Sequence, residues 1–222
     1  LSTYQNIPFK RLTHLFETVF GLHISEGSVS NMLNAMRRLS KKPYEMIRRK
    51  VADGKVAGAD ETGVNVSGGN NWLWAFQNAV ATYLAFDRSR SHKVVNRHFS
   101  PEELGGTVWV TDRWPAYFMG DVGIEDHQIC IAHLLRNLTY TMQAFPDDAW
   151  SLDMLDLLKD SVRHRHEGDI GQDVRTEMEG RLDELLARSP IYTKEDGEAT
   201  ELDKLKKSIA KHRDHVFTFL TN

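Results

Sequence analysis

The chain has 222 residues, of which 41% are hydrophobic and 27% are charged, and its formal net charge is −3 at pH 7. This length and composition suffice to bury a core in one large domain or two modest ones. No stretch approaches the roughly eighteen consecutive apolar residues that a transmembrane helix needs, so we expect no membrane partner. No secretory signal pattern opens the sequence, and the single cysteine, Cys130, excludes an internal disulfide framework, so we expect a cytoplasmic protein.

The first 55 residues carry a positive charge that the total conceals. They contain ten Lys or Arg against four Asp or Glu, a charge of +6, so the remaining residues carry −9. A basic segment attached to an acidic body indicates that the segment binds a polyanion and that the body carries out the chemistry. A solvated helical surface explains the same charge equally well.

Two helices are predicted within this basic segment. An apolar face over Phe9–Phe20 stops at Gly21, and Ser25 is a suitable N-cap for a second helix that runs to Leu39. Helix, short turn and helix outline a helix-turn-helix, whose cations would lie near DNA phosphates. The cations that we predict to contact DNA are Arg37, Arg38, Lys41 and Lys42. The alternative is a small helical bundle that only packs on the core.

The residues around Asp60 place an acid inside an apolar, β-prone run. Val56–Val66 is predicted as a strand bounded by Gly54 and by the Gly68–Gly69 turn. Burying an ionised Asp in a sheet is costly unless a cation, a proton or a hydrogen-bond donor compensates the charge. Asp60 is therefore the first candidate metal ligand, whereas Glu61 should face the opposite way and be solvated or paired.

A second acid, Asp112, ends the β-prone run that begins at Thr107. Further strands are expected at Asn71–Ala79, Val80–Phe86 and Asp126–Ile131, with helices at Ser91–Phe99 and Pro115–Met119. Three antiparallel strands followed by helix, strand, helix and strand is the order of a ribonuclease H-like fold, an α/β fold with a mixed sheet flanked by helices. In that topology the first and fourth strands are neighbours, so Asp60 and Asp112 would converge on one cation where the strands end.

Two carboxylates at this position favour Mg²⁺ or Mn²⁺. These hard cations prefer oxygen ligands, keep several waters and are commonly held by one or two carboxylates plus a substrate phosphate. Two such ions about 3.5–4 Å apart can activate the attacking oxygen and stabilise the leaving oxygen of a phosphoryl displacement. Asp60 and Asp112 are therefore predicted to be metal ligands and catalytic residues.

Three motifs together resemble a known family. Asp60–Gly63 (DETG), Thr111–Tyr117 (TDRWPAY) and Cys130–Leu138 (CIAHLLRNL) have the order and spacing of the central region of bacterial insertion-sequence-66 family transposases, of the DDE class. This resemblance covers roughly residues 1–160. It implies metal-dependent cleavage and strand transfer of DNA, with transposon ends and target DNA as partners. Asp60 and Asp112 would be the first two catalytic carboxylates.

The third motif implies further roles. The resemblance suggests that Cys130 and His133 mark the end of the last strand and the start of a helix beside the active site. The pair could also be half of a zinc site, but structural zinc needs two more ligands at suitable spacing. Arg136 on that helix would reach a phosphate, with a surface ion pair as the alternative.

The resemblance also implies a third acid, a Glu in an Asn-Asn-x-x-Glu-Arg motif on a helix after a helical insertion. No such motif occurs before the last residue, Asn222, so we expect this carboxylate to be missing and the chain to be truncated, with poor metal affinity. Asp126, Glu167 and Glu195 are acids that could substitute for it, but none lies in a similar motif.

Three amphipathic helices are predicted beyond Asn137, with apolar faces over Trp150–Val162, Val174–Leu186 and Leu202–Leu220. We interpret them as the helical insertion, which would contribute to DNA contact or to a homodimer. The predicted division is thus an N-terminal helix-turn-helix-like segment (1–53), a ribonuclease H-like core (54–145) and a helical insertion (146–222) with the core incomplete.

Two functions of different classes follow from these predictions. The first is a DDE transposase fragment that is inactive as an isolated chain but cuts and joins DNA with two Mg²⁺ ions in the complete enzyme. The second is a non-catalytic DNA-binding or oligomerisation remnant, in which the acidic pair is vestigial. A nuclease of another ribonuclease H-like family is a third and less favoured alternative.

Overall fold

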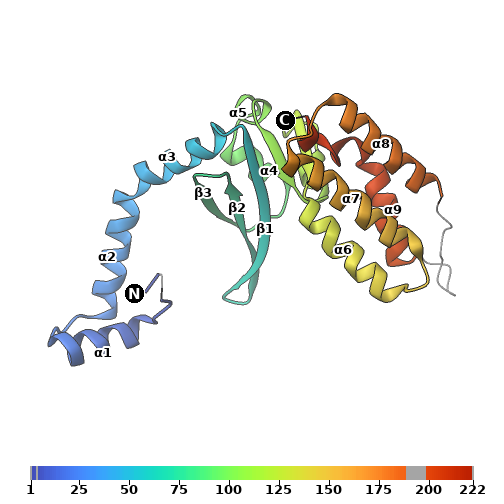
Figure 1. The fold of residues 1–222 in the computed structure, drawn as a ribbon. Coiled ribbons are helices and arrows are strands. Elements are labelled where there is room, and N and C mark those ends of the chain that lie inside the picture. The colour runs from blue at the N-terminus through green and yellow to red at the C-terminus, as the bar shows by residue number, and fades with distance from the viewer. Residues whose placement is uncertain (1, 4, 189–198, 222) are drawn as a thin grey trace. The chain divides into compact units, whose positions relative to one another are not determined.

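The computed structural model describes residues 2–3, 5–188 and 199–221, and it divides into two compact units, Leu1–Arg48 and Arg49–Asn222. The division falls within helix α3 (Lys41–Ala52), which the two units share (Figure 1). Among the described residues, no helix combines the length and the apolar character that crossing a bilayer requires.

The first unit consists of α1 (Phe9–Phe20), α2 (Glu26–Leu39) and the start of α3. Gly21 adopts the left-handed conformation at φ 62° and ends α1, and its N–H donates to the carbonyl of Glu17 at 3.0 Å. The Ser25 side chain caps α2 by accepting a hydrogen bond from the Ser28 N–H. Both predicted helix ends are therefore confirmed.

The second unit is built on a five-stranded mixed sheet with the strand order β3-β2-β1-β4-β5 (Figure 1). Strands β1 (Val56–Val66), β2 (Gly69–Gln77) and β3 (Thr82–Asp87) form an antiparallel meander. Strands β4 (Val108–Thr111) and β5 (Asp126–Ile129) extend the sheet beyond β1 in parallel orientation. This order confirms the predicted ribonuclease H-like fold, with β1 at the centre and β4 beside it.

A two-residue turn joins β1 to β2. Ser67 and Gly68 both have positive φ, at 53° and 81°, which gives the turn a twist that matches the twist of the hairpin strands. The Gly68 N–H donates to the Asn65 side-chain oxygen at 3.1 Å. This local geometry fixes the register of the hairpin, which pairs Asp60 with Ala75.

Helices α4 (His92–His98) and α5 (Pro101–Gly105) connect β3 to β4, and a 3₁₀ helix, η1 (Pro115–Phe118), follows β4. The predicted helix before β4 is confirmed, whereas α5, which a capping box of Ser100 and Glu103 begins, was not predicted. Buried aromatic side chains fill the core between these helices and the sheet, among them Trp74, Phe76, Phe99 and Trp109.

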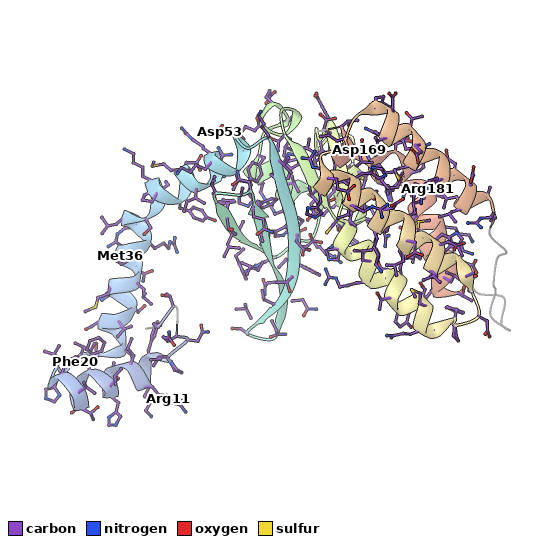
Figure 2. All side chains as sticks on the ribbon, in the orientation of Figure 1. Arg11, Phe20, Met36, Asp53, Asp169 and Arg181 are labelled. Atoms are coloured by element: carbon purple, nitrogen blue, oxygen red, sulfur yellow. The ribbon has the colours of Figure 1, made fainter. Side chains whose placement is uncertain are left out.

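The remaining helices are α6 (Ile131–Ala144), α7 (Ala149–Glu167), α8 (Gln172–Ala187) and α9 (Glu201–Lys211), which pack together as a bundle (Figure 1). They share one apolar cluster, to which they contribute Leu138, Met154, Leu182 and Leu205. Arg181 on α8, labelled in Figure 2, forms an ion pair with Asp160 on α7. The prediction that the amphipathic helices bury one another is confirmed.

The last predicted helix was wrong beyond Lys211. The chain continues instead as two 3₁₀ turns, η2 (Arg213–His215) and η3 (Thr218–Leu220). The Gln128 side chain on β5 donates to the Val216 carbonyl at 2.8 Å and accepts from the Phe219 N–H at 2.9 Å. These bonds occupy backbone groups that a continued helix would need, so β5 overrides the local helical pattern.

Candidate active site

Asp60 and Asp112 each directly follow one member of the same residue pair between β1 and β4. In the parallel pairing of β1 with β4, Ala59 is opposite Thr111, and the two acids are the next residue on each strand. Neighbouring strands lie about 4.8 Å apart, so the backbones of the two acids are adjacent. Strand β1 itself continues to Val66, so Asp60 marks the end of the parallel pairing rather than the end of the strand.

Each of the two carboxylates is held by one backbone N–H. Asp60 Oδ1 accepts from the Glu61 N–H at 2.9 Å, and Asp112 Oδ1 accepts from the Trp114 N–H at 2.8 Å. Asp60 is exposed and Asp112 is partly buried. The second oxygen of each makes no hydrogen bond to the part of the chain that the structure describes. The geometry therefore orients both side chains and leaves one oxygen on each for a ligand.

The buried acid of this strand is Glu61, which corrects the sequence-based argument about Asp60. Ala57, Ala59 and Glu61 alternate into the core, so Asp60 faces the other way. Glu61 accepts hydrogen bonds from Arg90 Nε at 2.7 Å and from the Tyr117 hydroxyl. Burial raises the pKa of Glu61, against the effect of both bonds. The predicted reason for a cation, a buried Asp60, was wrong, and the case for Asp60 rests on the register.

Tyr117 shows that the acids share one electrostatic environment. Burial is the main cause that raises the pKa of its hydroxyl, followed by the carboxylate of Glu61. The negative charges of Asp112 and Asp60 raise this pKa further. All three carboxylates therefore act on the same buried hydroxyl from neighbouring positions.

A pocket of about 350 Å³ lies beside Asp112. It is lined by Asp112, Arg113, Trp114, Ile129, His133, Asn137 and Ser208. Arg113 Nη2 donates to Asn137 Oδ1 at 2.9 Å, whereas Arg113 Nη1 and His133 Nδ1 are buried without a hydrogen-bond partner among the described residues. Burial lowers the pKa of Arg113 and Asp112 opposes this shift, but a guanidinium stays protonated. Sequence reasoning missed Arg113, although its position directly after Asp112 was a usable signal.

The predicted DNA-contacting cations are all exposed. Arg37 and Arg38 occupy the last turn of α2, and Lys41 and Lys42 open α3. Arg136 is exposed on α6, and its Nε donates to the Ala132 carbonyl at 3.3 Å. None of the five forms an ion pair with a described residue. These five charges are therefore accessible on the surface of the described residues.

The candidate substitutes for a third acid do not join the pair. Asp126 is opposite Val108 at the start of β5, which is the other end of the parallel strands from Asp112. Glu167 ends α7, and Glu195 lies outside the described residues. Over the described ranges, no group of three or more His, Cys, Asp or Glu is arranged to hold a metal ion.

Cys130 and His133 lie where the resemblance implied. Cys130 is the N-cap of α6, directly after β5, and His133 lies in the first turn of that helix. The Cys130 N–H donates to the carbonyl of Thr111 at 2.7 Å, which ties the start of α6 to the residue before Asp112.

The strand order is that of ribonuclease H-like proteins. Residues 2–222 match the family model described as the Transposase IS66 family. The chain therefore belongs to this family, and the sequence-based recognition is confirmed. No curated protein sequence is significantly similar to it.

Some solved structures are similar to the chain, but weakly. The dimeric form of the HTLV-2 integrase catalytic core domain in complex with magnesium is 14% identical over 41% of this chain and 74% of its own, with a TM-score of 0.29. The trimeric form of the same domain is 10% identical over 67% and 93%, with a TM-score of 0.29. An intasome of simian T-cell lymphotropic virus with PP2A regulatory subunit B56 gamma is 11% identical over 68% and 53%, with a TM-score of 0.30.

Proposed function

We propose that this transposase region holds divalent cations, Mg²⁺ or Mn²⁺, at Asp60 and Asp112 for the cleavage and strand transfer of DNA. The observation that supports the proposal is the β1–β4 register, in which Asp60 and Asp112 each follow a paired residue, while each carboxylate keeps one oxygen without a hydrogen bond to the described residues. Mg²⁺ binds through one or two carboxylates, waters and substrate phosphates, so this donor set fits it. When bound, such ions would activate the attacking oxygen and stabilise the leaving oxygen.

The protein's own groups would orient and neutralise the DNA strand. The N–H groups of Glu61 and Trp114 fix the two carboxylates before substrate arrives, which reduces reorganisation at the site. Arg113 lines the pocket beside Asp112, so its guanidinium would lie near a phosphate next to the cleaved bond. The pocket would therefore receive the strand that crosses the acidic pair.

The proposed partners are DNA and a second copy of the chain. Arg37, Arg38, Lys41 and Lys42 would hold phosphates through charge alone, and Arg136 would add a contact from α6. Because no group of three or more His, Cys, Asp or Glu among the described residues is arranged to hold a metal ion, we expect weak metal binding and no cleavage from this chain by itself.

A calorimetric Mn²⁺ titration tests the metal site. We expect the unaltered chain to bind Mn²⁺ weakly and Asp60→Asn and Asp112→Asn each to lose about 100-fold or more in affinity, because loss of a ligand should cost at least as much as loss of a residue that orients one, which is about ten- to a hundredfold. Asp126→Asn is the matched control, because it removes an exposed acid from the other end of the same parallel strands. This control should bind as the unaltered chain does.

Two other results of the titration would contradict the proposed metal site. Equal binding by Asp60→Asn and the unaltered chain would overturn the metal site. No binding by any form would favour the DNA-binding remnant.

A further inference from the structure

Glu61 is adjacent to Asp60 in sequence but opposite to it in the sheet, and its side chain is fully buried, at 0% exposure. Both of its oxygens are already bonded, Oε1 to Arg90 and Oε2 to the Tyr117 hydroxyl. A metal ligand would need an oxygen on the face of Asp60. The side chain of Glu61 is therefore not the missing third ligand, and its burial needs another explanation.

Arg90, the partner of Glu61, is clamped between two indole rings. Its guanidinium carbon lies 4.7 Å from the ring centre of Trp72 and 3.9 Å from that of Trp114. A cation at these distances is attracted to the ring faces. Trp72 comes from β2 and Trp114 from the segment after β4, so the Glu61–Arg90 pair fastens that segment to the sheet.

Trp114 in turn holds Asp112. Its indole Nε1 donates to the Arg90 carbonyl at 3.1 Å, and its backbone N–H donates to Asp112 Oδ1 at 2.8 Å. The Glu61 backbone N–H donates to Asp60 Oδ1 at 2.9 Å. A continuous series of direct contacts therefore runs from Asp60 through Glu61, Arg90 and Trp114 to Asp112.

Tyr117 anchors the same segment at a second point. It lies three residues beyond Trp114 on η1, and its hydroxyl donates to Glu61 Oε2. The residues between Asp112 and Tyr117 are thus tied to Glu61 from both ends. A shift of Glu61 would move the segment that sets the position of Asp112.

We propose that Glu61 is a positioning residue that sets the separation of Asp60 and Asp112. The inference rests on the proposed metal site at these two carboxylates. Cation affinity depends steeply on the spacing of ligands, and loss of partners that orient them costs about ten- to a hundredfold. A purely structural role for Glu61 would change the stability of the fold without changing cation affinity.

The test is a Mn²⁺ titration of the full chain and its variants, with electron paramagnetic resonance as the readout of bound Mn²⁺. Thermal unfolding of each variant without metal measures its stability. Glu61→Gln places an amide N–H₂ against Arg90 or Tyr117, so we expect an affinity loss of about tenfold or more. Trp114→Ala removes the stack on Arg90 from a side chain that is 36% exposed, and it should fold and lose affinity in the same direction.

Val95→Ala is the control for stability. Val95 is 1% exposed in the same core as Trp74, and no contact of the Glu61 series involves it. This variant should lower the melting temperature and keep the Mn²⁺ affinity. If Glu61→Gln does not fold, Trp114→Ala decides the question.

The outcomes separate the inference from the function on which it rests. If Asp60→Asn and Asp112→Asn lose Mn²⁺ while Trp114→Ala and Glu61→Gln bind normally, the positioning role is wrong and the metal site stands. If the two Asp variants bind like the unaltered chain, or if that chain binds no Mn²⁺, the metal site itself fails and the inference falls with it. An affinity loss shared by Val95→Ala would reduce Glu61 to a structural residue.

Discussion

The two units of the chain differ in what they bury and in what they expose. The complete helices of the first unit, α1 and α2, bury only Leu12 and Val29 among the described residues, whereas the second unit buries two large apolar clusters. Phe20 on α1 and Met36 on α2, labelled in Figure 2, are 59% and 57% exposed. The contrast places the buried core and the proposed carboxylate site in the second unit, while the described helices of the first unit offer charge and exposed apolar side chains.

A matched pair of methionines gives the largest contrast. Met154→Ala should destabilise the protein by about 2–5 kcal/mol, because Met154 is 0% exposed in the helical cluster and its loss leaves a cavity. Met36→Ala removes the same atoms from an exposed site and should change stability by less than about 0.5 kcal/mol. Urea unfolding measures both. Equal losses would show that the first unit is packed in solution against a surface, such as a second copy, that covers Met36.

The second unit also contains buried histidines whose pKa values are lowered, so its stability should depend on pH. His127 on β5 is buried against Phe118, 4.3 Å between ring centres, and its Nε2 lies 2.6 Å from Thr111 Oγ1. Burial, followed by the charges of His215 and His212, lowers the pKa of His127 to about 3. Burial and then Lys211 lower the pKa of His212 to about 4. Both values lie below the usual value of about 6.5 for an unfolded chain.

The sign of the pH effect follows from these shifts. Between about pH 6.5 and pH 3 the unfolded chain binds more protons at these histidines than the folded chain does, so stability falls as the pH falls. The free energy of unfolding should fall between pH 6.5 and pH 4.5 by roughly 2 kcal/mol less in His127→Phe than in the unaltered chain, because each proton contributes about 1.4 kcal/mol per pH unit. His14→Phe, an exposed site in the first unit, is the control. If the free energy of unfolding of His127→Phe has the same pH dependence as that of the unaltered chain, His127 is not the cause of the effect.

The elements that local signals define were predictable from the sequence. Gly21 and Ser25 end and begin helices through their own backbone and side chain, and a turn was predicted after Val66, although it lies at Ser67–Gly68 and not at Gly68–Gly69. The neighbouring placement of Asp60 and Asp112 followed from the order of strands, which permits few topologies. These features depend on short stretches of chain or on the overall connectivity.

Features that depend on distant partners were not predictable. The pattern around Asp60 gives the alternation of faces but not which face is covered, so the burial of Glu61 required Arg90 and Tyr117, 29 and 56 residues away. The end of α9 depends on Gln128, 88 residues before Val216. The pocket of Arg113 forms only where α6 and Ser208 of α9 approach the end of β4. Sequence spacing contains none of these contacts.

Neutralising the four cations tests the proposed role of the first unit in DNA binding. Replacing Arg37, Arg38, Lys41 and Lys42 with Gln should weaken DNA binding by about ten- to a hundredfold at low salt. It should also reduce the slope of log K against log salt by up to about 3.6, at about 0.9 per phosphate contact. Mn²⁺ affinity should stay unchanged. Fluorescence anisotropy over a salt series measures the slope.

The control removes the same number of exposed cations from the second unit. The four positions are Lys159, Arg163, Arg165 and Arg188 on α7 and at the end of α8. If this control flattens the slope as much as the first set does, DNA affinity reflects total charge and the first unit has no special role.

Replacement of Arg136 should have the smallest effect on DNA affinity, and it tests whether the second unit also contacts DNA phosphates. It belongs to the second unit, on the helix that starts beside Asp112, so DNA that reaches the acidic pair should pass it. Arg136→Gln should reduce the salt slope by about 0.9 and affinity by less than about tenfold, in addition to the effect of the four first-unit cations. A normal slope in Arg136→Gln would confine phosphate contact to the first unit and to Arg113. A loss larger than one phosphate contact would show that α6 holds the DNA strand and that the first unit only guides it there.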